Sequence, residues 1–319
     1  MKKRVFIDGS EGTTGLRIHE RLSSRGDISL IKAEEEKRKE PSERKKLINS
    51  ADIIFLCLPD KAAKESVSLI ENENVRVIDA STAHRTAQGW IYGLPELSEE
   101  RLTAVREAKR LSVPGCHATG FNVLVYPLTE MKIAPQGYPF CAHSITGYSG
   151  GGKKMIAEYG EKPLPQCLKS PRQYALSQCH KHLPEMQKTC GLSFPPVFTP
   201  IVSDYYSGMV VTVPVLPRLL DKKMTAEEMM EFFSDYYKKS KLIEVMPKDG
   251  GIAEDGFLDA AAMAGSDGLQ IFVAGNDERI LLISRFDNLG KGASGAAVEC
   301  MNLMLGIDEL KGLRLKKGS

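Results

Sequence analysis

The sequence predicts an α/β protein in which a doubly wound parallel sheet comes first and an α+β domain with a mostly antiparallel sheet follows. Over the first 115 residues, short apolar runs alternate with helical patterns, as in parallel sheets whose strands are joined by helices. After residue 137 the apolar runs become longer and carry Gly and Pro at their ends, which indicates a different kind of domain. At roughly 150 residues per domain, 319 residues are enough for two domains.

The strands expected in the first region are continuous apolar runs. They are Val5–Ile7, Ile28–Ile31, Ile53–Leu58, Val75–Ile78 and Leu111–Val113, and helical patterns lie between them at about 16–22, 43–50, 61–72 and 98–109. Because apolar residues follow one another instead of alternating with polar ones, these strands should be buried on both faces, as in a parallel sheet.

The second region is expected to combine strands with two helices. Strands are predicted at 140–145, 197–215, 270–274 and 280–286, and a turn at 275–277 separates the last two. A helix with a charged face is predicted at about 225–239, and a second helix, rich in small residues, at about 291–305.

Charge and cysteine content exclude several classes of protein. The chain has 43 basic and 41 acidic residues, so no strong positive field favours nucleic acid or an anionic membrane. No apolar stretch approaches the roughly 20 residues that span a bilayer, and the apolar run near the N-terminus is too short for a signal peptide. The seven cysteines are odd in number and form no CxxC pair, which favours a cytoplasmic protein without disulfides or a structural metal. The basic residues 311–317 are expected to form a solvated tail.

A glycine-rich turn follows the first predicted strand. Gly9, Gly12 and Gly15 have the spacing G-x-x-G-x-x-G before a helix. Glycines there allow a tight turn and let a dinucleotide pyrophosphate approach the backbone and the helix N-terminus; an ordinary tight turn is the alternative. After the second strand, Glu34–Glu36 would suit the ribose of NAD and Lys37–Arg38 the 2′-phosphate of NADP, so the cofactor type stays open, as does a merely solvated charge run.

Cys116 is the most informative residue of the chain. Pro114 and Gly115 end a strand, and a helical pattern follows, so Cys116 is expected at a helix N-terminus. The positive end of the helix dipole lowers a thiol pKa and favours a thiolate nucleophile, and the backbone N–H groups could hold an oxyanion. The alternative is a buried, inert cysteine, which is the commonest role of this residue type.

Histidines can supply the base that a thiol nucleophile needs. His180 and His182 lie close together, and Glu185 could orient an imidazole. A metal site built from the two histidines and Glu185 is less well supported, because no third ligand cluster accompanies them. His84 and His143 stay open as further candidates, and His19 is expected on the surface of the first helix.

Seven motifs together resemble those of N-acetyl-gamma-glutamyl-phosphate reductases, of the shorter of the two known groups. In chain order they are Gly9–Gly15, Asp79–Arg85, Tyr92–Glu96, Pro114–Gly120, Gly147–Lys153, His180–Glu185 and Asp287–Ala293. Any one of them could occur by chance, but all seven in this order are highly specific. His117 stands where longer members often have a tyrosine, which fits the shorter group.

The resemblance implies a fold and an activity. The fold would be a Rossmann-like NADP-binding domain formed by residues 1–116 and 288–319, with a catalytic and dimerisation α+β domain at 117–287. The activity would be the third step of arginine biosynthesis, the NADPH-dependent reduction of N-acetyl-L-glutamyl 5-phosphate to N-acetyl-L-glutamate 5-semialdehyde. A cysteine thioester and a homo-oligomer, a dimer or a tetramer, are further expectations from the resemblance.

The resemblance also implies the roles of individual residues. Cys116 would be the nucleophile and His182 the acid/base group, with His180 and Glu185 close by. The cofactor would contact Gly9, Ser10, Gly12, Thr13, Thr14, Gly15, Ser81, Thr82, Asn288, Gly290 and Gly292. Arg85 and Ser149 would bind the substrate.

Two other readings remain alternatives. An aspartate-semialdehyde dehydrogenase would use the same thiol chemistry on a shorter substrate without the acetyl group. A catalytically inactive NADP-binding regulator could keep the fold, although the presence of Cys116, His182 and Glu185 disfavours it. The absence of a Cys-Thr-Thr-Asn stretch disfavours a glyceraldehyde-phosphate dehydrogenase.

Overall fold

The computed structural model describes residues 2–32, 36, 40–248, 250, 252 and 256–316 and divides into two compact units. Unit 1 comprises Met1–Pro114 and Ala293–Leu313, and unit 2 comprises Gly115–Gly292 and Arg314–Ser319. The fold class expected from the sequence is confirmed, with a parallel sheet in unit 1 and a mixed, mostly antiparallel sheet in unit 2. No helix in the described part of the chain is long and apolar enough to cross a membrane.

Unit 1 is built on a parallel sheet with the strand order β2-β1-β3-β4-β6-β5. Its described strands are β1 (Lys3–Asp8), β2 (Ile28–Ile31), β3 (Ile53–Leu56), β4 (Arg76–Asp79), β5 (Ile91–Tyr92) and β6 (Arg110–Ser112). Each predicted run forms a strand, whereas the two-residue β5 is too short to show an apolar pattern. The four residues of β3 are all buried, as continuous apolar runs in parallel sheets predict.

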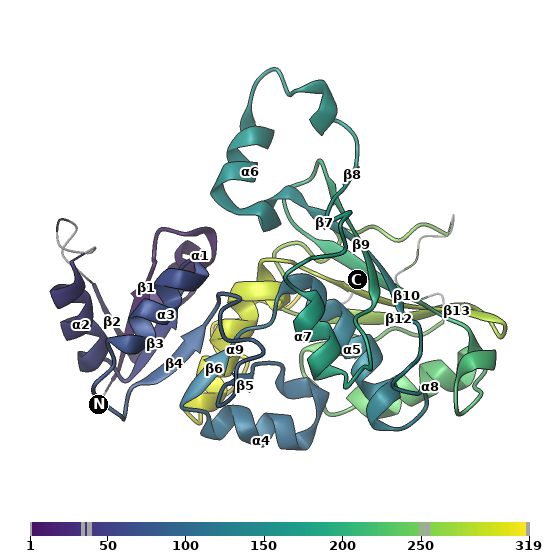
Figure 1. Ribbon diagram of the computed structural model, residues 1–319, viewed down its shortest axis with the longest axis horizontal. Helices are drawn as coiled ribbons and strands as arrows, with labels where there is room; N and C mark the ends of the chain where they lie inside the picture. Colours follow the sequence, from purple (N-terminus) through teal and green to yellow (C-terminus); the bar gives the residue numbers. More distant parts are fainter. Residues whose placement is uncertain are drawn as a thin grey trace. The chain divides into compact units, whose positions relative to one another are not determined.

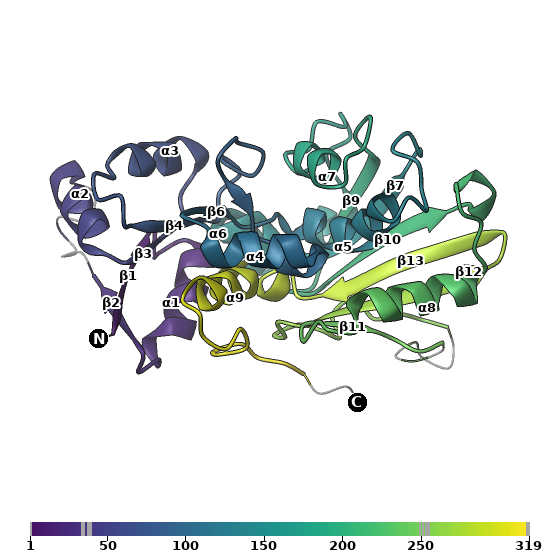
Figure 2. The ribbon, with the colours of Figure 1, turned by 90° about the horizontal axis from the view of Figure 1, so that it is seen from below.

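Helices cover both faces of this sheet (Figure 2). They are α1 (Thr13–Ser23), α2 (Pro41–Ser50), α3 (Asp60–Ser68), α4 (Glu99–Glu107) and α9 (Gly295–Met304). One core contains Ile18 of α1, Val105 of α4 and Met301 of α9, and the core on the other face contains Ile48 of α2 and Ala63 of α3. The chain therefore contributes its last helix to the core of the N-terminal unit.

Unit 2 contains a sheet with the order β11-β12-β13-β10-β7-β9-β8. Figure 1 labels all of these strands except β11. Its described strands are β7 (Cys141–Gly147), β8 (Arg172–Gln173), β9 (Val197–Ser203), β10 (Met209–Val215), β11 (Ile243–Val245), β12 (Leu269–Asn276) and β13 (Arg279–Phe286). The run expected at 197–215 is two strands, β9 and β10, joined by a turn. These two do not pair with each other, because β7 lies between them.

The helices of unit 2 include one that carries the site described below. They are α5 (Cys116–Glu130), α6 (Gly152–Gly160), α7 (Leu183–Thr189) and α8 (Ala226–Tyr237). α5 packs on β10 and β13, and its middle is wholly buried from His117 to Leu128. Gly120 allows this packing, since a Cβ there would lie 2.5 Å from a methyl group of Val211.

The C-terminal segment departs from the solvated tail expected at 311–317. The side chains of 314–316 are exposed, but the backbone N–H of Arg314 donates to Asp267 Oδ2 at 2.7 Å and its carbonyl accepts from Asp267 N at 2.7 Å. Lys316 Nζ also donates to the carbonyl of Ala262. Sequence patterns could not reveal this pairing, because it uses backbone groups opposite a segment about 50 residues away.

The unit boundaries lie at 114/115, 292/293 and 313/314. The sequence-based division placed the limits at 116 and 288, so Gly115, Cys116, residues 288–292 and residues 314–319 fall in unit 2 here. The short π-helical turn Gly290–Ser294 precedes α9, and together they occupy the helical stretch expected at 291–305. The functional division, with cofactor binding in one unit and catalysis in the other, stays a prediction.

Candidate functional site

Cys116 is the first residue of α5, as its position after Pro114 and Gly115 predicts. Gly115 is the N-cap, with an extended backbone and no side chain to accept from the first helical N–H groups. Its own N–H donates to Glu185 Oε2 at 3.0 Å, and Glu185 is 1% exposed. The first turn of α5 therefore presents N–H groups beside the thiol, which is the environment that favours a thiolate and a developing oxyanion.

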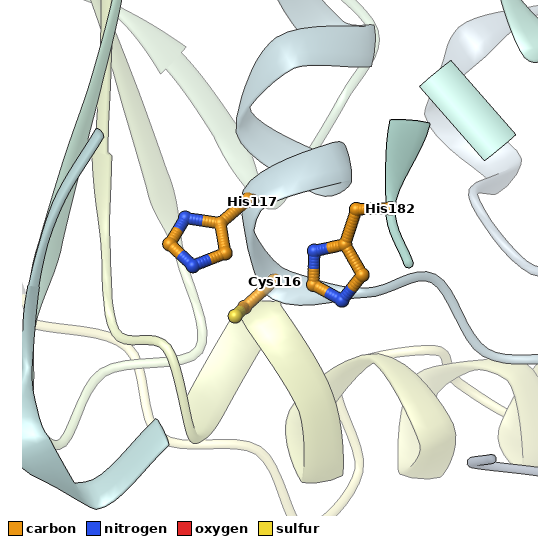
Figure 3. A group of neighbouring side chains, drawn as sticks. All are labelled: Cys116, His117 and His182. Atoms are coloured by element: carbon orange, nitrogen blue, oxygen red, sulfur yellow. The ribbon is translucent and has the colours of Figure 1, made fainter. Parts of the chain in front are cut away.

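Two imidazoles accompany this thiol (Figure 3). Cys116 Sγ, one nitrogen of His117 and one nitrogen of His182 all lie within 4.8 Å of one another. The ring of His180 meets that of His182 edge-on at 4.6 Å between centroids. His182 Nε2 is 3.9 Å from Glu185 Oε1. The structure thus brings together the four residues that the sequence suggested for catalysis.

His117 is held as a neutral imidazole. Its Nδ1 lies 2.6 Å from Ser144 Oγ, and its Nε2 lies 2.7 Å from the hydroxyl of Tyr174. Burial, and then the neighbouring charges of His180 and Lys181, lower the pKa of His117 to about 3. Burial and the nearby Cys116 raise the pKa of Tyr174, so its phenol also stays neutral. Sequence reasoning missed Ser144 and Tyr174, since neither lies near Cys116 along the chain.

Cys116, His117 and His182 also form a donor set that a soft divalent cation could take. Both ring nitrogens of His117 are already engaged by hydroxyl groups, so a cation would have to displace one of them. The arrangement therefore fits thiol chemistry better than metal binding.

The glycine turn of unit 1, predicted to bind the cofactor pyrophosphate, is tightly wound. Gly9 has φ +90°, and a Cβ at Gly15 would lie 2.3 Å from the carbonyl oxygen of Gly9. Only glycine fits at positions 9 and 15, and glycines in such a turn are what allows a pyrophosphate to approach the backbone in dinucleotide-binding folds. Gly12 is the N-cap of α1 and has no side chain that could accept from the first helical N–H groups. Thr13 and Thr14 are the first two residues of the helix. Gly9 and Ser10 line a cavity of about 510 Å³.

The Ser81–Arg85 stretch is fixed by hydrogen bonds within unit 1. Ser81 Oγ donates to Asp79 Oδ2 at 2.8 Å, and His84 Nδ1 lies 2.6 Å from the same oxygen. Thr82 bonds to Asp60. Arg85 Nε donates to the carbonyl of Val113 at 3.0 Å, so the guanidinium is positioned at the end of β6.

The Asp287–Gly292 loop of unit 2 reaches Cys116 at its last residue. A Cβ at Gly292 would be 2.8 Å from Cys116 Cβ, and one at Gly290 would be 2.1 Å from the carbonyl of Ser266. Asn288 Nδ2 donates to Ser149 Oγ at 3.0 Å, and its Oδ1 accepts from Gly208 N. The structure therefore places Gly292, an expected cofactor residue, against Cys116, and it links the expected cofactor residue Asn288 to the expected substrate residue Ser149.

Other candidates fall outside this group. His143 projects from an exposed position of β7 and bonds to Thr199, and His84 belongs to unit 1. Glu34, Glu35, Lys37 and Arg38, considered above for cofactor discrimination, lie outside the described residues.

Comparisons with known proteins agree in both halves of the chain. Residues 4–105 match the family described as semialdehyde dehydrogenase, NAD binding domain, and residues 116–288 match semialdehyde dehydrogenase, dimerisation domain. A Nostoc protein named N-acetyl-gamma-glutamyl-phosphate reductase 2 is 45% identical over 98% of this chain and 99% of its own length. A Pseudomonas putida protein of the same name is 45% identical over 95% of this chain and 96% of its own.

Solved structures support the fold. Aspartate semialdehyde dehydrogenase II of Vibrio cholerae superimposes with a TM-score of 0.71, 17% identity, and coverage of 96% of this chain and 99% of that one. The Francisella tularensis aspartate semialdehyde dehydrogenase gives the same TM-score at 15% identity, covering 96% of this chain and 100% of that one.

Fold, sequence matches and site define an oxidoreductase of the semialdehyde dehydrogenase type with a nicotinamide-dinucleotide-binding domain. Within that class, the chain belongs to the N-acetyl-gamma-glutamyl-phosphate reductase family.

Proposed function

We propose that the protein reduces N-acetyl-L-glutamyl 5-phosphate to N-acetyl-L-glutamate 5-semialdehyde and phosphate with NADPH, as the third step of arginine biosynthesis. The mechanism rests on one observation. Cys116 is the first residue of α5, and its Sγ lies within 4.8 Å of a ring nitrogen of His182. The names of the 45% identical relatives support the choice of substrate.

The chemistry uses Cys116 first as a nucleophile and then as a leaving group. His182 accepts the thiol proton, and the thiolate attacks the acyl carbon. The acyl–oxygen bond to phosphate breaks, and the proton leaves with phosphate, so a thioester to Cys116 remains. The bound nicotinamide supplies the hydride that reduces this thioester. The resulting thiohemiacetal then releases the aldehyde and restores the thiolate.

The chain's own residues account for binding and orientation in this scheme. N–H groups at the start of α5 stabilise the oxyanion, and Glu185 holds Gly115 so that this turn keeps its shape. The glycine turn of unit 1 receives the cofactor pyrophosphate, with Ser81 and Thr82 as further contacts. Asn288, Gly290 and Gly292 lie on the nicotinamide side, while Arg85 and Ser149 bind the substrate.

A homo-oligomer, a dimer or a tetramer, working in the cytoplasm completes the proposal. The family description of residues 116–288 as a dimerisation domain supports self-association. Ile145 on β7 and Val197 on β9 support it too, since these large apolar side chains are 39% and 55% exposed on paired strands.

Rapid mixing without phosphate tests the thioester. In the oxidative direction the aldehyde adds to Cys116 and loses hydride to NADP, and the acyl enzyme then needs phosphate to turn over. We expect a burst of NADPH absorbance close to the enzyme concentration, followed by slow hydrolysis, and one acyl group on the Cys116 peptide by mass spectrometry. Acyl label on Cys179 or Cys190 would contradict the site. Fast steady turnover without phosphate would mean that water is the acceptor.

The same assay separates the substrates. We expect N-acetylglutamate semialdehyde to react much faster than aspartate semialdehyde. The opposite preference would favour an aspartate-semialdehyde dehydrogenase, and failure of both would favour an inactive NADP-binding regulator.

A further inference from the structure

The cavity of unit 1 carries a cluster of cationic side chains. It occupies about 510 Å³ where the ends of β1 and β2 meet α1 and α2. Apolar walls suited to a purine ring come from Ile7, Leu16, Leu30 and Leu58, and the glycine turn closes one side. The cationic groups of the lining are Lys32 and Arg44, and the imidazole of His19 also lines the cavity. An apolar cavity with cations beside it fits a phosphorylated nucleoside.

Lys32 lies at the position where dinucleotide-binding folds contact the 2′ substituent of the cofactor ribose. It directly follows β2 and lies 20 residues beyond Gly12. A carboxylate at this distance accepts from both hydroxyls of an NAD ribose, whereas a cation accommodates a 2′-phosphate. Lys32 is exposed, and within the described part of the chain neither it nor His19 is recorded in an ion pair or hydrogen bond.

Arg44 neutralises the buried carboxylate of Asp8, which would otherwise repel a phosphate. Asp8 ends β1 in the cavity wall and is 5% exposed. Arg44 Nη2 donates to Asp8 Oδ2 at 2.9 Å, and Ser66 Oγ donates to the same oxygen at 2.7 Å. These contacts fix the guanidinium by one nitrogen and leave its other N–H groups for a ligand. Glu11 is the other acidic residue of the lining, and it is exposed.

We infer that this cavity binds the adenosine half of the cofactor and that Lys32, assisted by His19 and Arg44, binds the 2′-phosphate. The inference rests on the proposed NADP dependence and names the residues that produce it. It differs from the expectation that Lys37 and Arg38 form the clamp. Lys32 is the specificity-determining residue, because Arg44 is already committed to Asp8.

Adenosine 2′,5′-bisphosphate and adenosine 5′-phosphate isolate this half of the cofactor, so calorimetric titration of the full-length protein with each is the direct test. Wild type should bind the bisphosphate more tightly. Lys32→Ala should weaken bisphosphate binding about 10- to 100-fold, the worth of a charge-assisted hydrogen bond, and change 5′-phosphate binding less than about threefold. His19→Asn should have a smaller effect in the same direction.

Lys46→Ala is the matched control. Lys46 is an exposed lysine of α2 outside the cavity lining that pairs with Glu43, so its removal should leave both titrations unchanged. Lys32→Ala should also raise the KM for NADPH without lowering kcat in proportion.

Two results would overturn the inference, and they differ in what else they affect. If wild type prefers the bisphosphate but only a Lys37→Ala/Arg38→Ala variant loses that preference, the clamp lies elsewhere and the proposed NADP dependence stands. If wild type binds both probes equally and uses NADH as well as NADPH, the proposed cofactor itself is wrong.

Discussion

The thiol of Cys116 has two imidazoles of different character beside it. His117 is bound on both nitrogens by hydroxyl groups and stays neutral, whereas His182 lies between His180 and the carboxylate of Glu185. We therefore expect His182 to transfer the proton and His117 to shape the pocket.

Replacing the nucleophile should stop the reaction. Cys116→Ser is expected to lower kcat by more than about 10³-fold, since a serine hydroxyl is far less acidic and less nucleophilic than a thiol. Dinucleotide binding, followed by fluorescence titration, should survive. Cys167→Ser, at an exposed cysteine, is the control and should be fully active. Activity of Cys116→Ser within tenfold of wild type would remove Cys116 from the mechanism.

His182 should be the more important of the two neighbouring histidines. His182→Asn is expected to lower kcat by about 10²–10⁴-fold, the usual contribution of a positioned acid/base group. His180→Asn should lower kcat less, because His180 contacts the ring of His182 edge-on and does not belong to the group formed by Cys116, His117 and His182. Steady-state kinetics of both variants decide the matter, and a larger loss for His180→Asn would exchange the two roles.

His117 should make the protein less stable in mild acid. Its pKa falls from 6.5 in the unfolded chain to about 3 in the folded protein, so below pH 6.5 the unfolded state binds the extra proton. The stabilisation is complete above pH 6.5 and is lost as pH falls toward 3. From pH 7.5 to pH 5 this residue alone should reduce the free energy of unfolding by about 2 kcal/mol.

The His117→Gln variant isolates that contribution. Glutamine keeps hydrogen-bonding groups for Ser144 and Tyr174 but does not titrate. Urea unfolding at both pH values should show a smaller pH dependence for the variant than for wild type. Equal pH dependence of the two proteins would mean that His117 is not buried as a neutral group.

At the scale of elements, the glycine turn is the least tolerant feature of unit 1. Gly15→Ala would place a methyl group 2.3 Å from the carbonyl oxygen of Gly9 and 2.9 Å from Ser10 Cα, which are backbone atoms. We expect a loss of about 1–3 kcal/mol in stability, as for an overpacked site, together with loss of cofactor binding. Gly26→Ala, where no atom lies within 4 Å, is the control. Thermal unfolding and dinucleotide titration of both variants test this.

Sequence patterns predicted the elements well where apolar periodicity was strong. The parallel strands of unit 1, the helix after Cys116 and the β12–β13 pair are all present. The patterns did not reveal β5, α6, or the separation of β9 from β10 by β7, because strand order depends on contacts that a one-dimensional pattern does not contain.

The candidate site was predictable as a list of residues and less so as a network. Cys116, His180, His182 and Glu185 stand in distinctive motifs, and the structure gathers them. Ser144 and Tyr174 were missed because their hydroxyl groups gain importance only through their distances to His117. His19, Lys32 and Arg44 of the unit 1 cavity come from α1, the segment after β2 and α2, so their proximity is likewise a property of the fold.

At the scale of the whole molecule, the returning C-terminal segment supports unit 2. Asp267 is wholly buried and accepts from Arg314 N, so removal of residues 314–319 would leave a buried carboxylate without that donor. We expect a cost of about 1–3 kcal/mol and lower kcat, because Gly290 packs directly on Ser266 and Asp267. Removing only 317–319 is the control. Urea midpoints and activity of both truncations provide the measurement, and two truncated proteins of equal stability would contradict the role of this segment.

The placement of α9 in unit 1 has a consequence for how the protein is made. Val298, Met301 and the other buried residues of α9 complete an apolar core whose remaining buried members lie before residue 114. At a synthesis rate of roughly 5–20 residues per second, the ribosome needs about 10–40 s to add the intervening chain. Throughout that interval the nascent N-terminal sheet lacks the helix that covers part of one face, and its apolar residues are open to chaperones or to wrong partners. Unit 1, which is expected to bind the cofactor, therefore finishes folding only after residues 115–292 of unit 2, including Cys116, have been synthesised, although its first strand leaves the ribosome first.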